Sequence, residues 1–373
     1  MHLTLHLTNK CNLNCEYCFV QHGNESMTRE VAFAAVKFGM EDKKSSGLLF
    51  YGGEPLLEKQ LIYDIAEHSI DIKEKTGHIF YYKTTTNGTL LDEEFLKFSR
   101  DINMTLGFSH DGMVQDDCRS FTSGGGTFGM LEEKIPLVLK YQPYAVGMSV
   151  MAPSTVHNAV KTIQFLFEKG FRYMTMSLNY DINAPWTKKH FAILEEEYKK
   201  MAEMYIKWTK AEEKFYLAPF EMKILSHLKG EKYHADRHRL AQNQLSVAPD
   251  GKIFHSSKFV GFPEFAIGDV FSGIDLEKQK MIENKVLTPP APCQECALRP
   301  RCNYAYGNLS LQSGAIVCET PSPVQCSHEQ LITPIADYIA EKLYKERNAL
   351  FIHKHYNASY PVASLIEDKS LHL

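Results

Sequence analysis

The chain has 373 residues, which suffices for two domains or for one large α/β domain with an extension. Hydrophobic residues make up 44% and charged residues 23% of the sequence, which excludes a disordered or collagen-like chain. A formal net charge of -4 argues against a nucleic-acid or anionic-membrane surface. No apolar run approaches the roughly 20 residues of a membrane-spanning helix, and the N-terminus lacks the pattern of a signal peptide. We therefore expect a cytoplasmic protein that binds neither nucleic acid nor a membrane.

The first half of the chain alternates short β-branched or aromatic runs with helical patterns. The predicted strands cover 2–8, 47–51, 79–86, 103–109, 145–151 and 172–179. Apolar residues at helical spacing, such as Val31, Ala35 and Phe38, occupy the segments between them. These strand–helix repeats indicate a parallel sheet with crossover helices over roughly residues 1–185. The alternation alone leaves both an open doubly wound sheet and a partial barrel possible.

The second half of the chain has a different character. A strong helical pattern covers 188–229, and a hairpin follows with its turn at 249–252. The chain then becomes rich in Cys, Pro and Gly, so it has little core of its own and needs a metal for order. A final helix is predicted from about Ser327 to Asn348. We therefore expect four parts, at residues 1–187, 188–244, 245–330 and 331–373.

The nine cysteines are unevenly distributed along the chain. Cys118 stands alone, and we interpret it as a structural or surface thiol. The others form two groups near the two ends of the chain, which are Cys11, Cys15 and Cys18, and then Cys293, Cys296, Cys302, Cys318 and Cys326. Because cytosolic reductants keep thiols reduced, we expect these cysteines to be metal ligands or catalytic groups and not a disulfide framework.

The first group has the spacing CxxxCxxC and directly follows the first predicted strand. Three closely spaced thiolates, from Cys11, Cys15 and Cys18, suit three irons of a [4Fe–4S] cluster and leave the fourth iron open to a non-protein ligand. A structural zinc site has four protein ligands, so a zinc or redox loop is the weaker alternative.

This cysteine motif, with the aromatic Tyr17 before its third cysteine, resembles the radical S-adenosylmethionine (SAM) superfamily. GGEP at 52–55 follows the second strand and resembles the family motif that binds the methionyl amino group of SAM. TNG at 86–88 and SHDG at 109–112 resemble the motifs that reach the ribose and the carboxylate, although an Asn-Gly pair is also an ordinary turn. Ligands of parallel α/β sheets bind at these strand ends. The resemblance implies SAM contacts from Tyr17, Gly52, Gly53, Glu54, Asn87 and Ser109.

The resemblance also implies a fold and a reaction. The fold is α/β, a partial (βα)6 TIM-like barrel with a C-terminal cysteine-rich iron–sulfur extension. The enzyme takes an electron from a flavodoxin- or ferredoxin-type donor and cleaves SAM to a 5′-deoxyadenosyl radical. That radical abstracts hydrogen from an unreactive carbon. The sequence identifies no catalytic acid or base.

The second cysteine group begins with the spacing CxxCxxxxxC, from Cys293, Cys296 and Cys302. Alone, this spacing would suit zinc as well as iron. In this chain it resembles the SPASM extension of peptide-modifying radical enzymes, which holds auxiliary [4Fe–4S] clusters. Either Cys326 or Cys318 is the fourth ligand of this auxiliary cluster. We favour Cys326, because it lies just before the predicted final helix.

The extension departs from the family pattern at several positions. Ser256 and Ser257 stand where the family commonly has a Cys-Asp pair, and Tyr306 stands where a cysteine is expected. No cysteine lies between Thr122 and Pro292. We therefore expect one auxiliary cluster, and two [4Fe–4S] clusters in total.

The segment around 111–128 resembles a pattern shared by sulfatase-maturing enzymes and maturases of ribosomally made peptides. It contains Asp111, Asp117, Arg119 and Gly125. The leading hypothesis is a peptide maturase that installs a thioether or carbon–carbon crosslink, on a peptide that could be Cys-rich. An anaerobic sulfatase-maturing enzyme is the alternative, weakened because Ser257 replaces the acid of that group. A non-catalytic electron carrier would have no use for a SAM pocket.

The sequence also bears on peptide recognition. The first predicted strand starts at residue 2, so no separate leader-binding domain is expected before the barrel. We expect a peptide or protein substrate to be recognised by the barrel mouth, the cysteine-rich extension or a separate protein.

Overall fold

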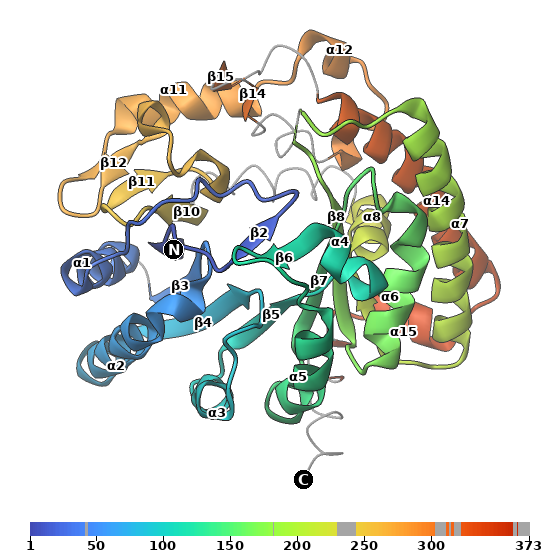
Figure 1. Ribbon diagram of the computed structural model, residues 1–373. Coiled ribbons are helices and arrows are strands. Elements are labelled where there is room, and N and C mark those ends of the chain that lie inside the picture. The colour runs from blue at the N-terminus through green and yellow to red at the C-terminus, as the bar shows by residue number, and fades with distance from the viewer. Residues whose placement is uncertain are drawn as a thin grey trace.

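The computed structural model describes residues 1–41, 44–181, 183–229, 244–302, 311–312, 315–316, 322–360 and 364. A parallel sheet is at its centre (Figure 1). Its six middle strands are β1 (His2–Thr8), β3 (Ser45–Gly52), β4 (Ile79–Thr86), β5 (Thr105–Ser109), β7 (Val146–Met151) and β8 (Tyr173–Leu178). These positions agree with the six predicted strands to within two residues at every end.

Two further parallel strands and a short antiparallel ribbon extend the sheet at its edges. β9 (Tyr216–Leu217) pairs with β8, and β10 (Gln244–Val247) pairs in parallel with β1. The antiparallel strands are β11 (Lys252–Phe254), β12 (Gly268–Asp269) and β13 (Gly273–Ile274). Within the described ranges the order of the 11-stranded sheet is β13-β12-β11-β10-β1-β3-β4-β5-β7-β8-β9. The predicted hairpin therefore continues the barrel sheet directly.

Helices connect the strands and cover the outside of the sheet (Figure 1). Those of the barrel are α1 (Arg29–Met40), α2 (Lys59–Thr76), α3 (Glu93–Asp101), α5 (Phe128–Tyr141) and α6 (Ala159–Glu168). Those that follow are α7 (Lys188–Lys210), α8 (Ala218–Lys229), α11 (Leu276–Leu287), α12 (Ala291–Gln294), α14 (Pro323–Lys345) and α15 (Ala349–Tyr356). None of the helices in the described ranges has the length and apolar character that crossing a bilayer requires.

Short elements complete the described chain. They are β2 (Leu13–Cys15), β6 (Arg119–Phe121), β14 (Leu311–Gln312), β15 (Ala315–Ile316), α4 (Gln115–Cys118) and the 3₁₀ helices η1 (Pro55–Glu58), η2 (Gly112–Val114), η3 (Val156–Asn158), η4 (Ser257–Phe259), η5 (Pro263–Phe265) and η6 (Arg299–Arg301). Two of these, β2 and β6, pair antiparallel beside the barrel. They belong to the loops that carry the sequence motifs.

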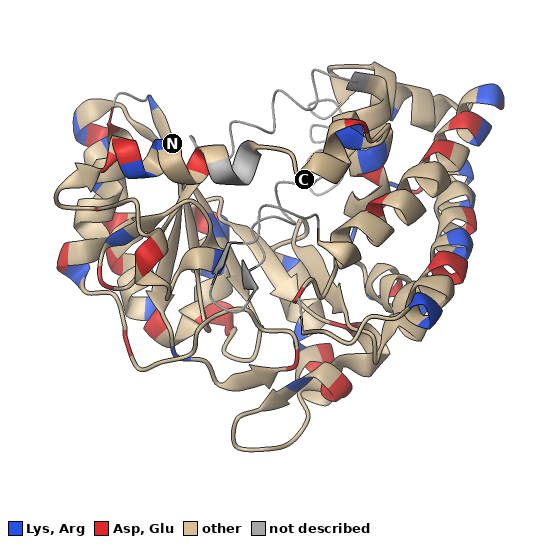
Figure 2. Cartoon of the chain, turned by 90° about the horizontal axis from the view of Figure 1, so that it is seen from above, with Lys and Arg blue, Asp and Glu red and all other residues tan. Residues whose placement is uncertain are grey.

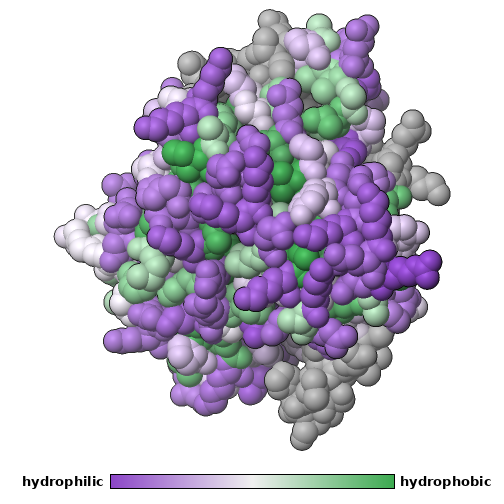
Figure 3. Space-filling view, turned by 90° about the vertical axis from the view of Figure 1, so that its right-hand side faces the viewer, coloured by the Kyte–Doolittle hydropathy of each residue, from purple (hydrophilic) through white to green (hydrophobic). Residues whose placement is uncertain are grey.

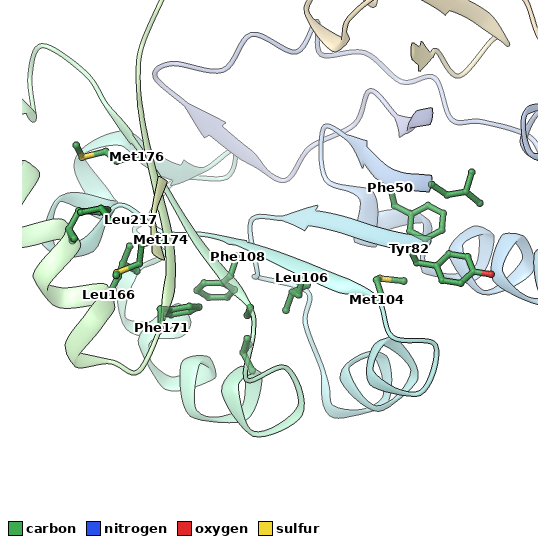
Figure 4. Packing of buried hydrophobic residues seen from close by; sticks show 14 of the residues in the cluster. Phe50, Tyr82, Met104, Leu106, Phe108, Leu166, Phe171, Met174, Met176 and Leu217 are labelled. Carbon is green, nitrogen blue, oxygen red and sulfur yellow. The ribbon is translucent and has the colours of Figure 1, made fainter. Parts of the chain in front are cut away.

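Successive side chains of a strand point to opposite faces of the sheet, which here has a packed outer face and a more open inner face. Leu3 points outward, since a side chain at Gly39 of α1 would meet its Cδ1 atom at 2.9 Å. Figure 4 shows the outer layer, in which Phe50 stacks on Tyr82 with ring centroids 6.5 Å apart. Residues of the opposite face, such as Tyr51 and Thr175, remain partly exposed. The hydrophobic core therefore lies between the sheet and its helices.

The second half of the chain differs in two details from the prediction. The helical pattern at 188–229 is divided between α7 and α8, and β9 lies between them. The final helix begins at Pro323, earlier than predicted, because Ser322 caps it by accepting from the Gln325 amide and proline suits a first helical position. Cys326 thus lies in the first turn of α14 and not before the helix. How these elements divide into domains stays a prediction.

The outer surface is polar. Figure 2 shows Lys and Arg interspersed with Asp and Glu along the outer helices, and Lys199 of α7 lies 2.8 Å from Glu195. The face that carries α7 and α14 is largely hydrophilic, with small separated hydrophobic areas (Figure 3). Such a mixed surface matches the nearly balanced charge of the sequence.

Candidate functional site

The loop of the first three cysteines is fixed by backbone contacts with the turn after β3. The Gly53 amide donates to the Thr8 carbonyl and the Glu54 amide to the Lys10 carbonyl, each at 2.9 Å. A Cβ atom at Gly53 would lie 2.1 Å from the Lys10 oxygen, so only glycine fits. The two glycines of the GGEP motif therefore serve first to bring this turn against the cysteine loop.

A short two-stranded ribbon holds the other side of the loop. Within it Cys15 of β2 is paired with Arg119 of β6, and the Glu16 amide donates to the Cys118 carbonyl at 3.0 Å. Behind the ribbon, Arg119 Nε donates to Asp111 Oδ2 at 2.8 Å, and both side chains are buried. Neither Asp111 nor Arg119 was predicted as a site residue, although both belong to the motif at 111–128.

Tyr17 also belongs to this buried cluster. Its hydroxyl donates to Asp111 Oδ2, and the Arg119 guanidinium carbon lies 5.1 Å from the centroid of its ring. Burial, followed by the nearby Asp111 carboxylate, keeps the pKa of Tyr17 well above its ordinary value, with Arg119 opposing the shift. The expected SAM contact of Tyr17 stays a prediction. The structure places its hydroxyl on Asp111.

Glu54 is a buried carboxylate at the centre of the motif turns. Its Oε1 atom accepts from the Leu56 amide at 2.9 Å and from the Thr86 hydroxyl at 2.7 Å. Its Oε2 atom accepts from the Asn87 amide at 2.8 Å. Burial raises the pKa of Glu54 to about 7 despite these hydrogen bonds. An ionised carboxylate has about four acceptor positions, so one position remains for a further donor.

Asn87 joins the end of β4 to the cysteine loop. Its side-chain amide donates to Asn12 Oδ1 at 2.9 Å, and its oxygen accepts from the Thr89 amide at 3.0 Å. Its Nδ2 atom lies 4.0 Å from the Cys11 sulfur. Ser109 is the last residue of β5 and is buried. The structure thus brings the loops after β1, β3 and β4 together at one edge of the sheet.

The three thiols of this loop are chemically suited to iron. All are free, Cys11 and Cys15 are half-buried, and burial raises the pKa of Cys11 to about 11. Burial also raises the pKa of Cys15 and Cys18. They are therefore thiols at neutral pH, and metal binding must release their protons.

Four cysteines of the second group, those that the structure describes, line one cavity. Cys293 lies in α12 and Cys296 two residues beyond its end, Cys302 directly follows η6, and Cys326 lies on α14. All four line the cavity together with Ser322, Gln325, Glu329, Leu298, Arg299 and Gln330. Cys318, the alternative fourth ligand, and Tyr306 lie outside the described residues.

Buried charges connect the helices that carry these cysteines. Lys223 of α8 forms an ion pair with Glu329 of α14, and each side chain is only 3% exposed. Lys223 also donates to the Arg301 carbonyl, beside Cys302, at 2.9 Å. Glu329 accepts from Gln325, beside Cys326, at 2.9 Å. The sequence showed no signal for this pair, because its members are 106 residues apart.

Arg301 adds a second link to the same helices. Its two terminal nitrogens donate to the Asp337 carboxylate of α14 at 2.8 and 2.6 Å, and its Nε atom donates to Ser226 of α8 at 3.2 Å. Such bidentate pairs fix geometry as well as adding energy. The residue before Cys302 is therefore fixed to both helices.

The donors that the structure places at both sites are cysteine thiols. In the part of the chain that the structure describes, no three His, Cys, Asp or Glu side chains are grouped so that they could hold one metal ion. A [4Fe–4S] cluster distributes its cysteines over separate irons, so its ligands need not converge on one point. Thiols around one loop and around one cavity are the donors such clusters use.

Two anaerobic sulfatase-maturating enzymes are similar in sequence to this chain. The cysteine-type anaerobic sulfatase-maturating enzyme of Clostridium perfringens (strain 13 / Type A) is 27% identical over 178 residues, which is 44% of this chain and 47% of that enzyme. The serine-type enzyme of Bacteroides thetaiotaomicron is 22% identical over 328 residues, which is 79% of each chain. The match with the Clostridium enzyme thus spans about half of that protein.

Solved structures show the same fold. Native anSMEcpe with bound AdoMet superimposes with a TM-score of 0.77 and 19% identity, over 92% of this chain and 99% of that chain. Streptococcus suis SuiB bound to precursor peptide SuiA superimposes with a TM-score of 0.59 and 13% identity, over 87% and 75% of the two chains. The predicted partial barrel with a C-terminal extension is confirmed.

The Radical SAM superfamily matches residues 5–166. This range runs from β1 to α6 and includes the cysteine loop, the turn at Glu54 and the ends of β4 and β5. The match covers the strand ends at which the motif loops meet, so this part of the chain, residues 5–166, resembles the radical SAM superfamily of enzymes.

Proposed function

We propose that Cys11, Cys15 and Cys18 hold a [4Fe–4S] cluster and that SAM binds beside it at the ends of β3, β4 and β5. When bound, these groups supply a 5′-deoxyadenosyl radical that abstracts hydrogen from an unreactive carbon. The electron comes from a flavodoxin- or ferredoxin-type donor. The observation that carries the proposal is the backbone contact of the three-thiol loop with the Glu54 turn.

The residues of this chain bind and orient the cofactor. Glu54 offers one remaining acceptor position, and an ammonium group is the donor that best suits a buried carboxylate. The backbone amides of Gly53 and Glu54 already donate to the cysteine loop, so Gly53 acts by its small size. Asn87 keeps Asn12 and hence the cysteine loop in register with β4. Tyr17, Gly52 and Ser109 remain proposed cofactor contacts.

We propose one auxiliary [4Fe–4S] cluster held by Cys293, Cys296, Cys302 and Cys326. The shared cavity of these four thiols supports this assignment. At the position of the Cys-Asp pair, the Ser257 hydroxyl lies 3.0 Å from that of Ser246. Neither serine can replace a thiolate, which supports the proposal of a single auxiliary cluster.

The proposed substrate is a ribosomally made peptide, on which the enzyme installs a thioether or carbon–carbon crosslink. The fold is shared with SuiB, whose structure contains its precursor peptide, and with anSMEcpe, whose structures contain Cp18Cys and Kp18Cys peptides. Sulfatase maturation is the second candidate, because curated relatives carry that activity in their names. The serine at 257 gives that candidate no carboxylate at this position.

Mass spectrometry of peptide products separates the two candidates. The reconstituted enzyme, with SAM and a reductant, is incubated with a Cys-rich peptide and with a peptide that carries the cysteine site of a sulfatase. A crosslink removes two hydrogen atoms from the first peptide. Formylglycine formation replaces the thiol of the second by an aldehyde oxygen. Aldehyde in the second peptide without change in the first would overturn the crosslinking proposal.

A further inference from the structure

Lys258 is positioned by the segment that joins the extension to the cysteine loop. It lies in η4, next to Ser257, whose hydroxyl contacts Ser246 of β10 at 3.0 Å. Gly261 follows closely, and a Cβ atom there would lie 2.8 Å from Cγ of Gln21. The backbone around Lys258 is therefore packed between the edge of the barrel sheet and the loop that ends the CxxxCxxC motif.

The side chain of Lys258 reaches the opposite edge of the barrel. Its Nζ atom lies 5.9 Å from the ring centroid of Tyr180, which follows β8. The strands β1, β3, β4, β5 and β7 lie between β10 and β8 in the sheet, so the contact crosses its open side. The Tyr180 hydroxyl is itself held by His328 Nδ1 at 2.7 Å. The Lys258 ammonium therefore lies over a ring whose own position is set by a hydrogen bond to α14.

The ammonium group of Lys258 lacks a carboxylate partner among the residues that the structure describes. Burial lowers the pKa of Lys258, and the negative charge of Asp181 opposes this shift. Asp181 is exposed and lies beyond ion-pair distance. Lys252, on the strand β11 that precedes η4, instead forms an ion pair with Asp250. Lysines removed from water are almost always paired, so a half-buried ammonium that has no carboxylate partner among the described residues indicates a place for an anion.

We propose that Lys258 binds a carboxylate of the peptide substrate and so places the peptide beside the cysteine loop. This inference rests on the proposed peptide substrate and adds a specificity-determining residue to it. A peptide carries carboxylates on Asp and Glu side chains and at its C-terminus. The ammonium group offers three donors, whereas the neutral isosteres Asn and Gln bring no charge to meet it.

The test is a binding selection from random peptides, so the natural peptide need not be identified first. Randomised N-acetylated heptapeptides with a fixed central cysteine are passed over immobilised, cluster-loaded enzyme with SAM. One library ends in an amide and the other in a free carboxylate. Bound peptides are sequenced by mass spectrometry. The variants are Lys258→Met, Lys258→Arg and, as a matched control, Lys252→Met, with iron content and unfolding temperature as folding checks.

The wild-type enzyme and Lys252→Met should enrich Asp and Glu over Asn and Gln about tenfold at one position, since a charge-assisted hydrogen bond is worth roughly that factor. Lys258→Met should lose the enrichment and Lys258→Arg should keep most of it. Stronger retention of the free-acid library than of the amide library, lost in Lys258→Met, would assign the C-terminus as the carboxylate. Acid preference that survives in Lys258→Met, or equal retention of both libraries without any acid preference, would overturn this inference alone. No retained peptide at all would overturn the proposed peptide substrate as well.

Discussion

The two cysteine groups are held in place in different ways. The first group lies on one loop, Cys11 to Cys18, which is fixed by backbone hydrogen bonds. The second group combines two distant segments of the chain, which buried charges hold together. The first loop is packed against the glycines after β3 and paired with β6. At the second site, Cys302 and Cys326 are brought together by the pairing of α8 with α14 through Lys223 and Glu329. A local site is thus specified by its own sequence, and a composite site depends on the packing of helices.

The difference between the two sites predicts different consequences for similar substitutions. Loss of a ligand at the first site should remove catalysis while the barrel stays folded, because the sheet and its core do not depend on the loop. Loss of a ligand at the second site should also loosen the surrounding chain, which has little core of its own.

The largest effect is expected for Cys15→Ala. The variant should lose SAM cleavage, and its iron should fall from about eight to about four per chain, since two thiolates do not retain a cluster that needs three. Iron analysis and chromatography of 5′-deoxyadenosine after anaerobic reconstitution measure this. Cys118→Ala is the matched control and should behave like the wild type. An iron content near eight in Cys15→Ala would contradict the ligand assignment.

Cys326→Ala should lose the auxiliary cluster and increase hydrogen exchange in α12, η6 and the start of α14. The first cluster and its SAM cleavage without peptide should persist. Mössbauer spectra of Cys326→Ala and Cys318→Ala, recorded side by side, decide the fourth ligand. Loss of the second cluster in the Cys318 variant, with retention in the Cys326 variant, would reverse our assignment.

The buried ion pair allows a direct test of how the second site is held together. Lys223→Met should lower the free energy of unfolding by about 3–5 kcal/mol, because it leaves the Glu329 carboxylate buried without its partner. Combining it with Glu329→Met should restore much of that stability. Chemical denaturation of the wild type, the two single variants and the double variant gives the four free energies of unfolding of a double-mutant cycle. A double variant that is no more stable than Lys223→Met would show that the pair does not hold α8 and α14 together.

A smaller, pH-dependent effect is expected at Glu54. Because burial raises its pKa to about 7, ionising this carboxyl as the pH rises through that value costs stability in the SAM-free protein. An ammonium group prefers the ionised carboxylate, so SAM affinity should increase with pH up to about 7 and then level off. Equilibrium dialysis with labelled SAM measures the profile. Glu54→Gln should bind about tenfold more weakly and lose the dependence, and an unchanged profile would remove Glu54 from the SAM site.

Features formed by contiguous or repeated sequence patterns could be predicted from the sequence. The strands of the barrel, the three-cysteine loop and the turns at Glu54 and Asn87 are contiguous patterns, so spacing and strand order were enough to place them near one another. The ion pairs of Asp111 with Arg119 and of Lys223 with Glu329 were missed, because pairing between buried charges depends on tertiary contacts. The parallel pairing of β10 with β1 was missed for the same reason, since the two strands are far apart in the sequence.

The hydrogen bonds from Gly53 to Thr8 and from Glu54 to Lys10 make the proposed cofactor turn and the cysteine loop one mechanical unit. A displacement of either segment is transmitted to the other through backbone atoms, without an intervening side chain that could absorb it. Damage to the cysteine loop by oxygen should therefore reach Glu54 as well. In this protein, loss of iron and loss of SAM affinity should proceed at the same rate.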